Sequence, residues 1–354
     1  MTFWQGRRVL ITGQTGFKGA WLAHWLTLRG ARVFGLALAP DTAPALFTQL
    51  DLANRIDHRL GDIRDAAVVA RAVDHAAPEV VFHLAAQPLV RRSYREPIET
   101  FATNVMGTIH LLDALRGATS PVQAVMITTD KVYHNREWVH AYRETDRLGG
   151  HDPYSASKAA CEIAIESYRK SFLAGSPVKI AVARAGNVIG GGDRAEDRIL
   201  PDIIRAAMTG QPLLLRNPHA LRPWQHVLDP LAGYLHLAEA LATGQPGAEE
   251  AFNFGPDAAD QRRVGDLLTE AQRHWPLDWV DGSDPAAVHE AGLLALSTDK
   301  ARAVLGWRPR WDFATSVART VAWYRAVDQQ GASALACTTH FLSKSPTLAT
   351  TCAD

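Results

Sequence analysis

A hydroxyl, a carboxylate and an amine stand side by side at Thr129, Asp130 and Lys131. The apolar run over residues 123–128, directly before them, predicts a strand that ends at this point. Ligands of open parallel sheets bind at the carboxyl ends of the strands. We therefore expect these three side chains to lie in a site, with groups that can donate and accept protons.

A second set of reactive groups follows at the start of a predicted helix. Asp152 supplies an N-cap carboxylate and Pro153 the first helical position. Tyr154 and Lys158 come next, and a spacing of four residues places them on one face of the helix. A tyrosine with a pKa of about 10 is a poor base at neutral pH, but a nearby ammonium favours its phenolate. The alternative is an unrelated surface pair, which the preceding motifs make less favoured.

The elements that must position these groups begin with a strand, a glycine turn and a helix. Residues 8–12 predict a buried strand, Gly13, Gly16 and Gly19 mark the turn, and residues 20–26 predict the helix. The glycines permit close approach of the backbone, and the helix N-terminus can face a pyrophosphate. The pattern therefore indicates a dinucleotide site, although its spacing is Gly-x-x-Gly-x-x-Gly rather than Gly-x-Gly-x-x-Gly.

The next strands leave two questions open. The strand predicted over 32–38 lacks a terminal acid that would bind the ribose hydroxyls of NAD, and Asp41 comes late. NAD and NADP are therefore not distinguished by that residue. Lys18, inside the glycine turn, could contact a phosphate or stay in solvent. Asp62, in the strand predicted over 58–63, could bind an adenine amine or cap the following helix.

Two long helices are expected around the site. Residues 98–116 predict one, carrying Asn104, which could tie neighbouring strands together, and residues 153–172 predict the other. Both are apolar on more than one face, so each must be buried on more than one face. A helix bundle between subunits is our preferred explanation, with a thicker core as the alternative. Before both helices, a strand predicted over 79–84 ends in small residues against which a cofactor could lie flat.

The second half of the chain departs from regular alternation. Residues 187–194 are glycine-rich and predict a loop. Asn187, Arg194 and Arg222 are candidate substrate contacts, because arginines bind two oxygens of a diphosphate at once. The tail after residue 330 is expected to fray. Further strands are expected over 178–183 and 250–254, and further helices over 199–209, 228–242 and 315–324.

Composition restricts the class of protein. The 354 residues are 47% apolar and 21% charged with a formal net charge of +0, so nothing suggests a nucleic-acid surface. The cysteines, Cys161, Cys337 and Cys352, form no Cys-x-x-Cys pair, which favours a reducing cytoplasm over disulfides. The 14 histidines show no metal-ligand spacing, so we expect no metal. The N-terminus shows no signal peptide, and no apolar run reaches membrane-spanning length.

Three motifs in this order resemble the extended short-chain dehydrogenase/reductase family: Thr12-Gly13-x-x-Gly16-x-x-Gly19, Thr129 and Tyr154-x-x-x-Lys158. The resemblance covers roughly residues 5–330. It implies an α/β fold, a doubly wound parallel (Rossmann) sheet with a smaller α/β C-terminal substrate domain. The domains expected are 1–185 for NAD, with a returning segment at about 226–250, 186–330 mainly for the sugar nucleotide, and 331–354 as a flexible tail.

A narrower resemblance indicates the substrate. The strings HLAAQPLVRRSY, TNVMGT, TTDKVY, RAGNVIGGGD and RPWQHVLDPLAGYL are similar to the 4,6-dehydratases of this family that act on CDP-glucose. Related enzymes generally carry glutamate where Lys131 stands. The resemblance implies NAD as cofactor, a homodimer or homotetramer, and a role in deoxysugar or lipopolysaccharide synthesis. A 4-epimerase, another nucleotide-sugar dehydratase, and a non-catalytic NAD(P) sensor on the same fold are the alternatives.

The resemblance also implies the roles of the reactive groups. Tyr154 accepts the proton of the sugar 4-hydroxyl, Thr129 bonds the 4-oxygen, and Lys158 lowers the tyrosine pKa and holds the nicotinamide ribose. Asp130 protonates the departing 6-hydroxyl. Lys131 is either the base for the carbon 5 proton, our hypothesis, or a cationic contact. The implied cofactor contacts are Gly13, Thr15, Gly16, Phe17, Lys18, Asp62, Ile63, Leu84, Ala85, Ala86, Asn104, Thr128, Tyr154 and Lys158, and the implied substrate contacts are Gln87, Asn187, Arg194 and Arg222.

Overall fold

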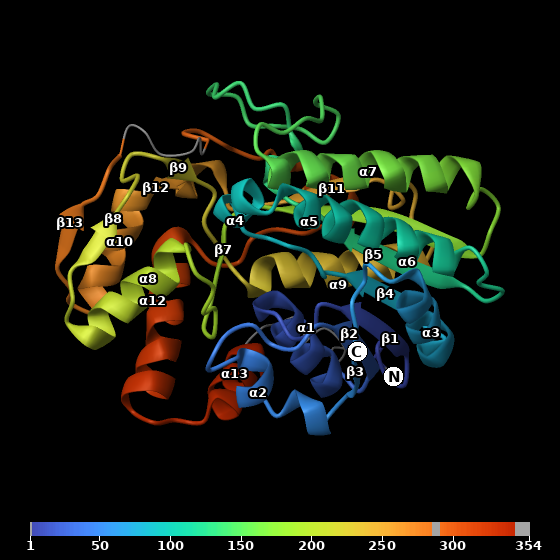
Figure 1. The fold of residues 1–354 in the computed structure, drawn as a ribbon, viewed down its shortest axis with the longest axis horizontal. Coiled ribbons are helices and arrows are strands. Elements are labelled where there is room, and N and C mark those ends of the chain that lie inside the picture. The colour runs from blue at the N-terminus through green and yellow to red at the C-terminus, as the bar shows by residue number, and fades with distance from the viewer. Residues whose placement is uncertain (1, 285–290, 344–354) are drawn as a thin grey trace, which may run out of the picture.

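The computed structural model describes residues 2–284 and 291–343, and its centre is a seven-stranded parallel sheet (Figure 1). The strand order is β11-β6-β5-β4-β1-β2-β3. The chain therefore reverses its direction of travel across the sheet between β1 and β4, which is where an open α/β sheet binds its ligand. The strands are β1 (Arg8–Thr12), β2 (Arg32–Ala37), β3 (Asp57–Leu60), β4 (Val80–His83), β5 (Val122–Ile127), β6 (Val178–Ala185) and β11 (Ala251–Phe254).

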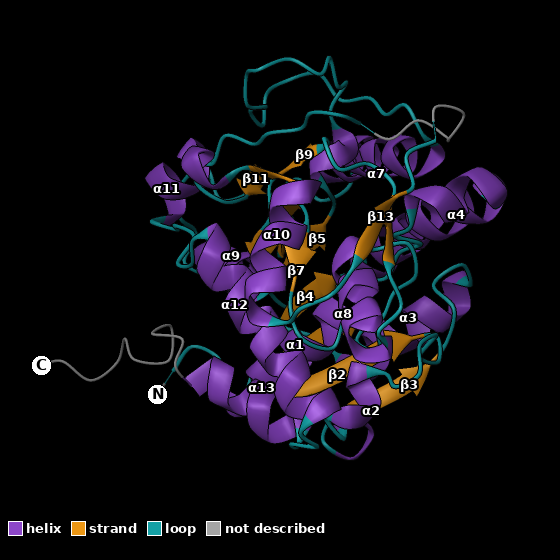
Figure 2. Cartoon of the chain, turned by 90° about the vertical axis from the view of Figure 1, so that its left-hand side faces the viewer, coloured by secondary structure: helices purple, strands orange, loops and turns teal. Residues whose placement is uncertain are grey.

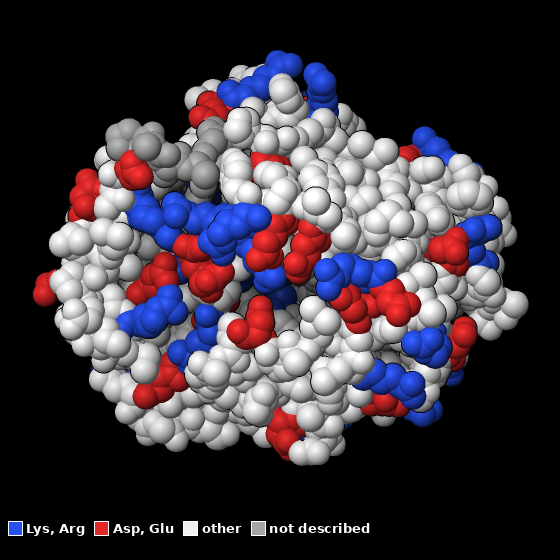
Figure 3. All heavy atoms as spheres, viewed as in Figure 1, with Lys and Arg blue, Asp and Glu red and all other residues white. Residues whose placement is uncertain are grey.

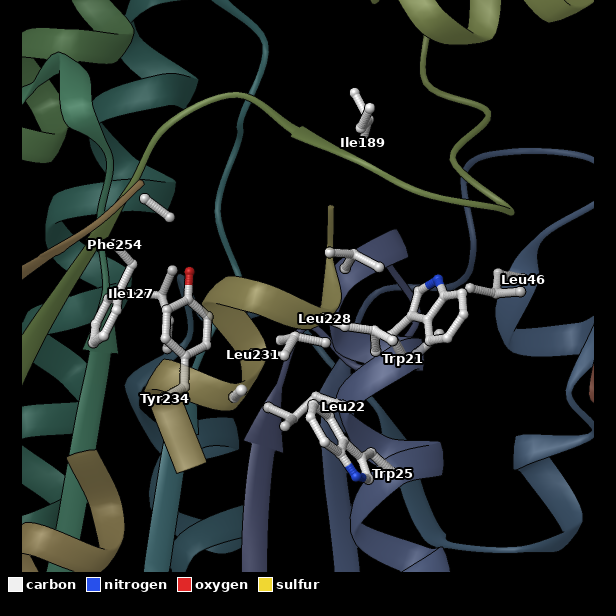
Figure 4. Close-up of a cluster of buried hydrophobic side chains, with 14 of the residues drawn as sticks. Trp21, Leu22, Trp25, Leu46, Ile127, Ile189, Leu228, Leu231, Tyr234 and Phe254 are labelled. Atoms are coloured by element: carbon white, nitrogen blue, oxygen red, sulfur yellow. The ribbon is translucent and has the colours of Figure 1, made fainter. Parts of the chain in front are cut away.

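Helices cover both faces of the sheet, as the apolar strands require. On one face lie α1 (Phe17–Leu28) and α9 (Leu228–Ala242), and α9 packs on β5 and β6. Figure 4 shows the core there, with Trp21, Trp25 and Tyr234 packed among aliphatic side chains. The other face carries α3 (Ala66–Ala76), α5 (Pro97–Phe101), α6 (Gly107–Leu115) and α7 (Pro153–Ser171).

Alternate residues of each strand supply the two cores. In β5, Val125 and Ile127 belong to the core with α1 and α9, whereas Ala124 and Met126 belong to the core with α3 and α6. Successive strand side chains point to opposite faces, so a sheet covered on both sides needs a continuous apolar run. The site residues after β5 thus follow a strand that is held from both faces.

A smaller part of the chain lies beside the sheet, on the left in Figure 1 and towards the viewer in Figure 2. It is built from short two-stranded pairs and helices. The pairs are β7 (Val188–Ile189) with β10 (Gln225–His226), β8 (Leu213–Leu215) with β13 (Trp279–Asp281), and β9 (Leu221–Arg222) with β12 (Arg262–Arg263). The helices are α8 (Ile199–Thr209), α10 (Val264–His274) and α12 (Phe313–Tyr324).

The remaining elements are short. They are α2 (Leu46–Gln49), α4 (Val90–Arg95), α11 (Asp299–Leu305), α13 (Ala334–Ser343), the 3-10 turns η1 (Leu52–Asn54), η3 (Asp130–Val132) and η4 (Ala258–Asp260), and the π-helical segments η2 (Ala102–Met106) and η5 (Arg325–Gln329). None of the helices within 2–284 and 291–343 is long and apolar enough to cross a membrane.

The predicted fold class is confirmed, and two details are corrected. The segment that returns to the sheet continues past residue 250, because β11 pairs with β6. The tail expected to be flexible contains α13, which packs on α1, with His24 Nε2 2.9 Å from Thr339 Oγ1. The apolar positions of this helix, among them the buried Leu342, explain why it is docked. The rest of the predicted tail, residues 344–354 with Cys352, lies outside the described residues.

Candidate active site

The three groups after β5 lie together in the 3-10 turn η3, as their position in the sequence predicts. The hydroxyl of Thr129 donates to Asp130 Oδ1 over 2.9 Å and accepts from the backbone N–H of Lys131 at 3.4 Å. Asp130 is buried, and its Oδ2 has no hydrogen-bond partner among the described residues. A buried carboxylate oxygen without a partner is costly to maintain, which is typical of a functional group.

The helix α7 presents Tyr154 to this turn. Asp152 caps the helix by accepting from Ser155 N at 2.9 Å, and Pro153 occupies its first turn. These two residues fix the start of the helix, so the side chain of Tyr154 is held within hydrogen-bonding range of Thr129. The end of β5 and the start of α7 are separated by a polar segment over residues 133–152, and they therefore meet in one place.

Burial raises the pKa of Tyr154 to about 12. The hydrogen bond with Thr129 acts in the opposite direction, but the charge of Asp130 adds to the rise. Lys158, expected to lower this pKa, is not among the groups that shift it. Its amine instead donates to the backbone carbonyl of Ile127 over 3.1 Å, and its own pKa is lowered by burial. Desolvation of the phenolate therefore dominates the pKa of Tyr154 in this structure, and activation of Tyr154 by Lys158 stays a prediction.

A buried polar network lies behind the catalytic turn. The hydroxyl of Thr128, expected to contact the cofactor, donates to Glu162 Oε1 over 2.7 Å. Arg184 pairs with Glu162, and both side chains are only 4% exposed. Arg184 also donates to the Tyr133 hydroxyl at 2.7 Å, which in turn donates to Asn253 Oδ1. The network ties β5, α7, β6 and β11 together directly beside the reactive groups.

Two adjoining cavities open in front of this turn. One, of about 270 Å³, is lined by the reactive groups and the glycine turn, and the other is about 620 Å³. Figure 3 shows a hollow near the middle of this face with charges of both signs around it. Lys131, Asn187, Arg198 and Arg222 line both cavities. The amine of Lys131 and Oδ1 of Asn187 have no hydrogen-bond partners among the described residues.

The glycine turn has the shape that a dinucleotide requires. Gly13 has a φ of +80°, and a Cβ there would lie 2.7 Å from the backbone nitrogen of Ala85. A Cβ on Gly19 would lie within 3 Å of the Gly13 carbonyl, so only glycine lets the turn close on the helix. The N-cap of α1, Gly16, makes no side-chain cap bond. The first N–H groups of α1 therefore remain available to a pyrophosphate, and the residues fit a dinucleotide.

The other residues predicted around the cofactor divide into two groups. Leu84 and Ala85 lie against Gly13, the ring of Phe17 lies against Gly190, and the Thr15 hydroxyl donates to Leu38 O. Ala86 follows this segment and is partly buried. In contrast, Ile63 is buried in the core beside α6.

Asp62 does not cap the next helix, so that alternative is wrong. Its carboxylate accepts from the backbone and the guanidinium of Arg64, which holds its pKa below the ordinary value. The N-cap of α3 is Asp65, whose side chain accepts from the N–H groups of Ala67 and Val68. A carboxylate three positions later, directly before the helical run, is the better cap. Binding of adenine by Asp62 stays a prediction.

Asn104 and Gln87 use their side chains within the protein. Asn104 Oδ1 accepts from Gln87 N at 2.8 Å, and its Nδ2 donates to Ser157 Oγ at 2.8 Å. Gln87 Nε2 donates to Thr100 Oγ1 at 2.9 Å, and its Oε1 accepts from Leu89 N. Asn104 therefore ties the loop after β4 to α7, rather than tying neighbouring strands together as the sequence suggested. Gln87 lines neither cavity, and its predicted contact with the substrate stays a prediction.

Arg194, also a predicted substrate contact, makes its contacts within the protein in this structure. Its guanidinium pairs with Asp328 at 2.6 Å and lies over the ring of Tyr324, away from both cavities. Arg198, four residues later in the same loop, lines both cavities where Arg194 was expected. Its guanidinium pairs with Asp193 at 2.8 Å. The sequence has no signal that separates two arginines in one loop. Arg222 is buried and lines both cavities.

Comparison with known proteins places this geometry in context. A family described as GDP-mannose 4,6 dehydratase matches residues 10–320. The chain is 46% identical over 332 residues to CDP-glucose 4,6-dehydratase of Salmonella typhimurium, covering 92% of each chain. It is 32% identical over 324 residues to dTDP-glucose 4,6-dehydratase of Streptomyces antibioticus, covering 90% of this chain and 92% of that relative. A double mutant of dTDP-glucose 4,6-dehydratase from Streptomyces venezuelae with NAD and DAU bound superposes with a TM-score of 0.78 at 27% identity, covering 91% of this chain and 98% of that one.

Proposed function

This chain belongs to the GDP-mannose 4,6-dehydratase family, and on that premise we propose that it removes water from CDP-glucose with NAD as its cofactor. The product is CDP-4-keto-6-deoxyglucose. One observation carries the choice of sugar nucleotide: the chain shares much more of its sequence with the relative named for CDP-glucose than with the one named for dTDP-glucose.

The chain holds the cofactor through the glycine turn, with the pyrophosphate at the N-terminus of α1. Bound NAD supplies a hydride acceptor for carbon 4 of the sugar and gives the hydride back to carbon 6. Lys158, which already donates to the Ile127 carbonyl, can donate a further hydrogen bond to the nicotinamide ribose. The solved relative with NAD bound supports NAD as the cofactor.

The proton transfers balance over one turnover. Tyr154, as phenolate, takes the proton of the 4-hydroxyl while Thr129 bonds the 4-oxygen. The resulting ketone acidifies the proton on carbon 5, which a base removes. Asp130 gives a proton to the departing 6-hydroxyl, which leaves as water. After carbon 6 has received its hydride, the base returns a proton to carbon 5. Tyr154 ends with one extra proton and Asp130 with one fewer, and exchange with solvent restores both.

Lys131 is the proposed base for carbon 5. An amine accepts a proton only in its neutral form, so this role requires Lys131 to be deprotonated before it acts on carbon 5. Its place in the cavity, without a described hydrogen-bond partner for its amine, supports a role towards the substrate. Arg222 and Arg198 are proposed to bind the diphosphate, which suits the fork geometry of a guanidinium.

We also propose a cytoplasmic location and association into dimers or tetramers. Cys161 and Cys337 are free thiols in the structure, as a reducing compartment allows. The outer face of α5 and α7 exposes Ile98 and Ile163. Exposed apolar side chains grouped on adjacent helices are typical of a subunit interface.

A substrate panel tests the activity. The protein is incubated with NAD and, separately, CDP-, dTDP-, UDP- and GDP-glucose, and mass spectrometry follows the loss of one water. We expect loss from CDP-glucose, none in a Tyr154→Phe control, and much slower loss from the others. If dTDP-glucose reacts fastest, the assigned base is wrong. If the sugar changes configuration without losing water, the protein is a 4-epimerase.

A further inference from the structure

Lys18 has an unusual place for a lysine. It is the second residue of α1, where the helix dipole is positive and where a cation is electrostatically unfavourable. Its amine does not extend into solvent, which was one of the two positions that the sequence allowed. It lies 3.5 Å from the hydroxyl of Tyr234, a fully buried residue of α9. The amine also lies 5.8 Å from the centroid of the Tyr234 ring. A long hydrogen bond and a cation–π contact near the limit of its range are both weak, so they offset little of the cost of burying an ammonium.

The amine of Lys18 faces the catalytic end of the smaller cavity. Lys18 lines that cavity together with Tyr154 and Asp130. The charges that act on it come from Asp130 in η3, Lys158 on α7, and Asp193 and Arg198 before α8. Figure 4 shows Tyr234 beside Ile127, at the end of β5 that leads into the catalytic turn. Charged groups from three separate segments around the cavity therefore act on this amine.

The hydride acceptor must lie close to the same place. Reacting atoms approach to about 3–3.5 Å, so a nicotinamide ring that takes hydride from carbon 4 must sit next to the sugar held by Tyr154. The pyrophosphate, in contrast, lies at the backbone N–H groups of the glycine turn. A charge on Lys18 therefore acts on the ring as well as on the phosphates, and the two effects differ in sign.

We propose that Lys18 sets the redox preference of the bound cofactor, favouring the reduced over the oxidised form. This inference rests on the proposed function. The oxidised ring carries a positive charge that an ammonium repels, whereas the reduced ring is neutral. A dehydratase needs the reduced form to persist while water leaves, and Lys18 supplies that bias. Burial and the nearby cations lower the pKa of Lys18 to about 7, so the bias strengthens as pH falls through neutrality.

The test compares the affinities for NADH and NAD in Lys18→Met, Lys18→Arg and the wild type. Coulomb's law at about 6 Å and an effective dielectric constant of about 20 predicts a change of up to ~100-fold in the ratio of the two dissociation constants. Fluorescence of NADH and calorimetry with NAD measure them from pH 6 to 9. We expect the preference for NADH to fall at least about tenfold in Lys18→Met, and to become independent of pH in Lys18→Arg, since a guanidinium does not titrate there.

Each other outcome is decisive. Equal weakening of both cofactors in Lys18→Met would make the lysine a phosphate contact, and unchanged ratios would make it a structural residue. Lys170→Met, exposed on α7, serves as the charge control and should change neither affinity. If Lys18→Met does not fold, Tyr234→Phe removes the hydroxyl and keeps the ammonium, so the preference for NADH must survive. Failure of the wild type to bind either cofactor would instead overturn the proposed function.

Discussion

At the scale of single residues, Tyr154 presents the main chemical difficulty. With a pKa of about 12 it holds its proton at neutral pH, and the fraction present as phenolate falls about tenfold for each pH unit below that value. A cation placed beside it favours the phenolate. The positive ring of the oxidised cofactor is such a cation, so cofactor binding and activation of the base are coupled.

We predict that NAD lowers the pKa of Tyr154 in the binary complex. Ultraviolet difference titration should show one tyrosine ionising at lower pH when NAD is bound, and that step should be absent in Tyr154→Phe. Loss of the base should also reduce the rate by at least about 100-fold. Identical titration curves with and without NAD would assign the activation to another group.

Lys131 gives a prediction that separates a base from a charge. In Lys131→Met, oxidation at carbon 4 should continue, seen as absorbance of reduced cofactor, whereas deuterium from solvent should no longer enter carbon 5. Lys131→Arg keeps the positive charge but cannot act as a base, because its pKa stays above about 12. If arginine restores exchange at carbon 5, the residue is a cationic contact.

The sequence predicts reactive groups better than it predicts their partners. The motifs that contain Thr129, Tyr154 and Lys158 were sufficient to predict that these residues lie together at the end of one strand. It could not indicate that the Lys158 amine donates to a backbone carbonyl, or that Arg198 rather than Arg194 lines the cavity. Those outcomes depend on where side chains from distant segments point, which local patterns do not encode.

At the scale of elements, the buried pair of Glu162 and Arg184 fixes α7 against β6. Both charges are removed from water, and each depends on the other for compensation. Glu162→Gln leaves the guanidinium of Arg184 without its counter-charge, and we predict a loss of about 3–5 kcal/mol in the free energy of unfolding. Urea denaturation measures this loss.

A matched control exists on α6. Asp113 pairs with Arg116 at 2.6 Å, but both side chains are about half exposed, so water replaces the lost partner. Asp113→Asn should therefore change stability by less than about 1 kcal/mol. A loss for Glu162→Gln as small as that of the control would show that the buried network adds little to stability.

Elements themselves were predictable where the apolar pattern is strong. The strands β1 and β5 and the helices α8 and α9 lie within a residue or two of the predicted ranges. The helix predicted over 98–116 is continuous but contains the π-helical segment η2, which carries Asn104. Nothing in its residue types marks that change. The packing of α13 on α1 was also not predicted. The helix has few apolar residues, and they do not identify the surface on which it packs.

At the scale of the whole molecule, one face exposes large apolar side chains. Figure 3 shows few charged side chains over α7 and its neighbours, compared with the hollow beside them. Ile98 on α5 is 85% exposed and Ile163 on α7 is 62% exposed. The two helices pack on each other, so these side chains belong to one surface. A second copy of the same surface, related by a two-fold axis, would cover both and form a four-helix bundle.

We therefore predict that the double variant Ile98→Glu and Ile163→Glu is smaller in solution than the wild type. Four carboxylates would be brought together in the bundle, and burial of unpaired charge is costly. Light scattering after size exclusion gives the mass, and Val280→Glu, an exposed position on β13, controls for added charge. An unchanged mass would place the interface elsewhere. Because α7 also carries Tyr154 and Lys158, dissociation should in addition lower activity, and this loss should be reversed by raising the protein concentration.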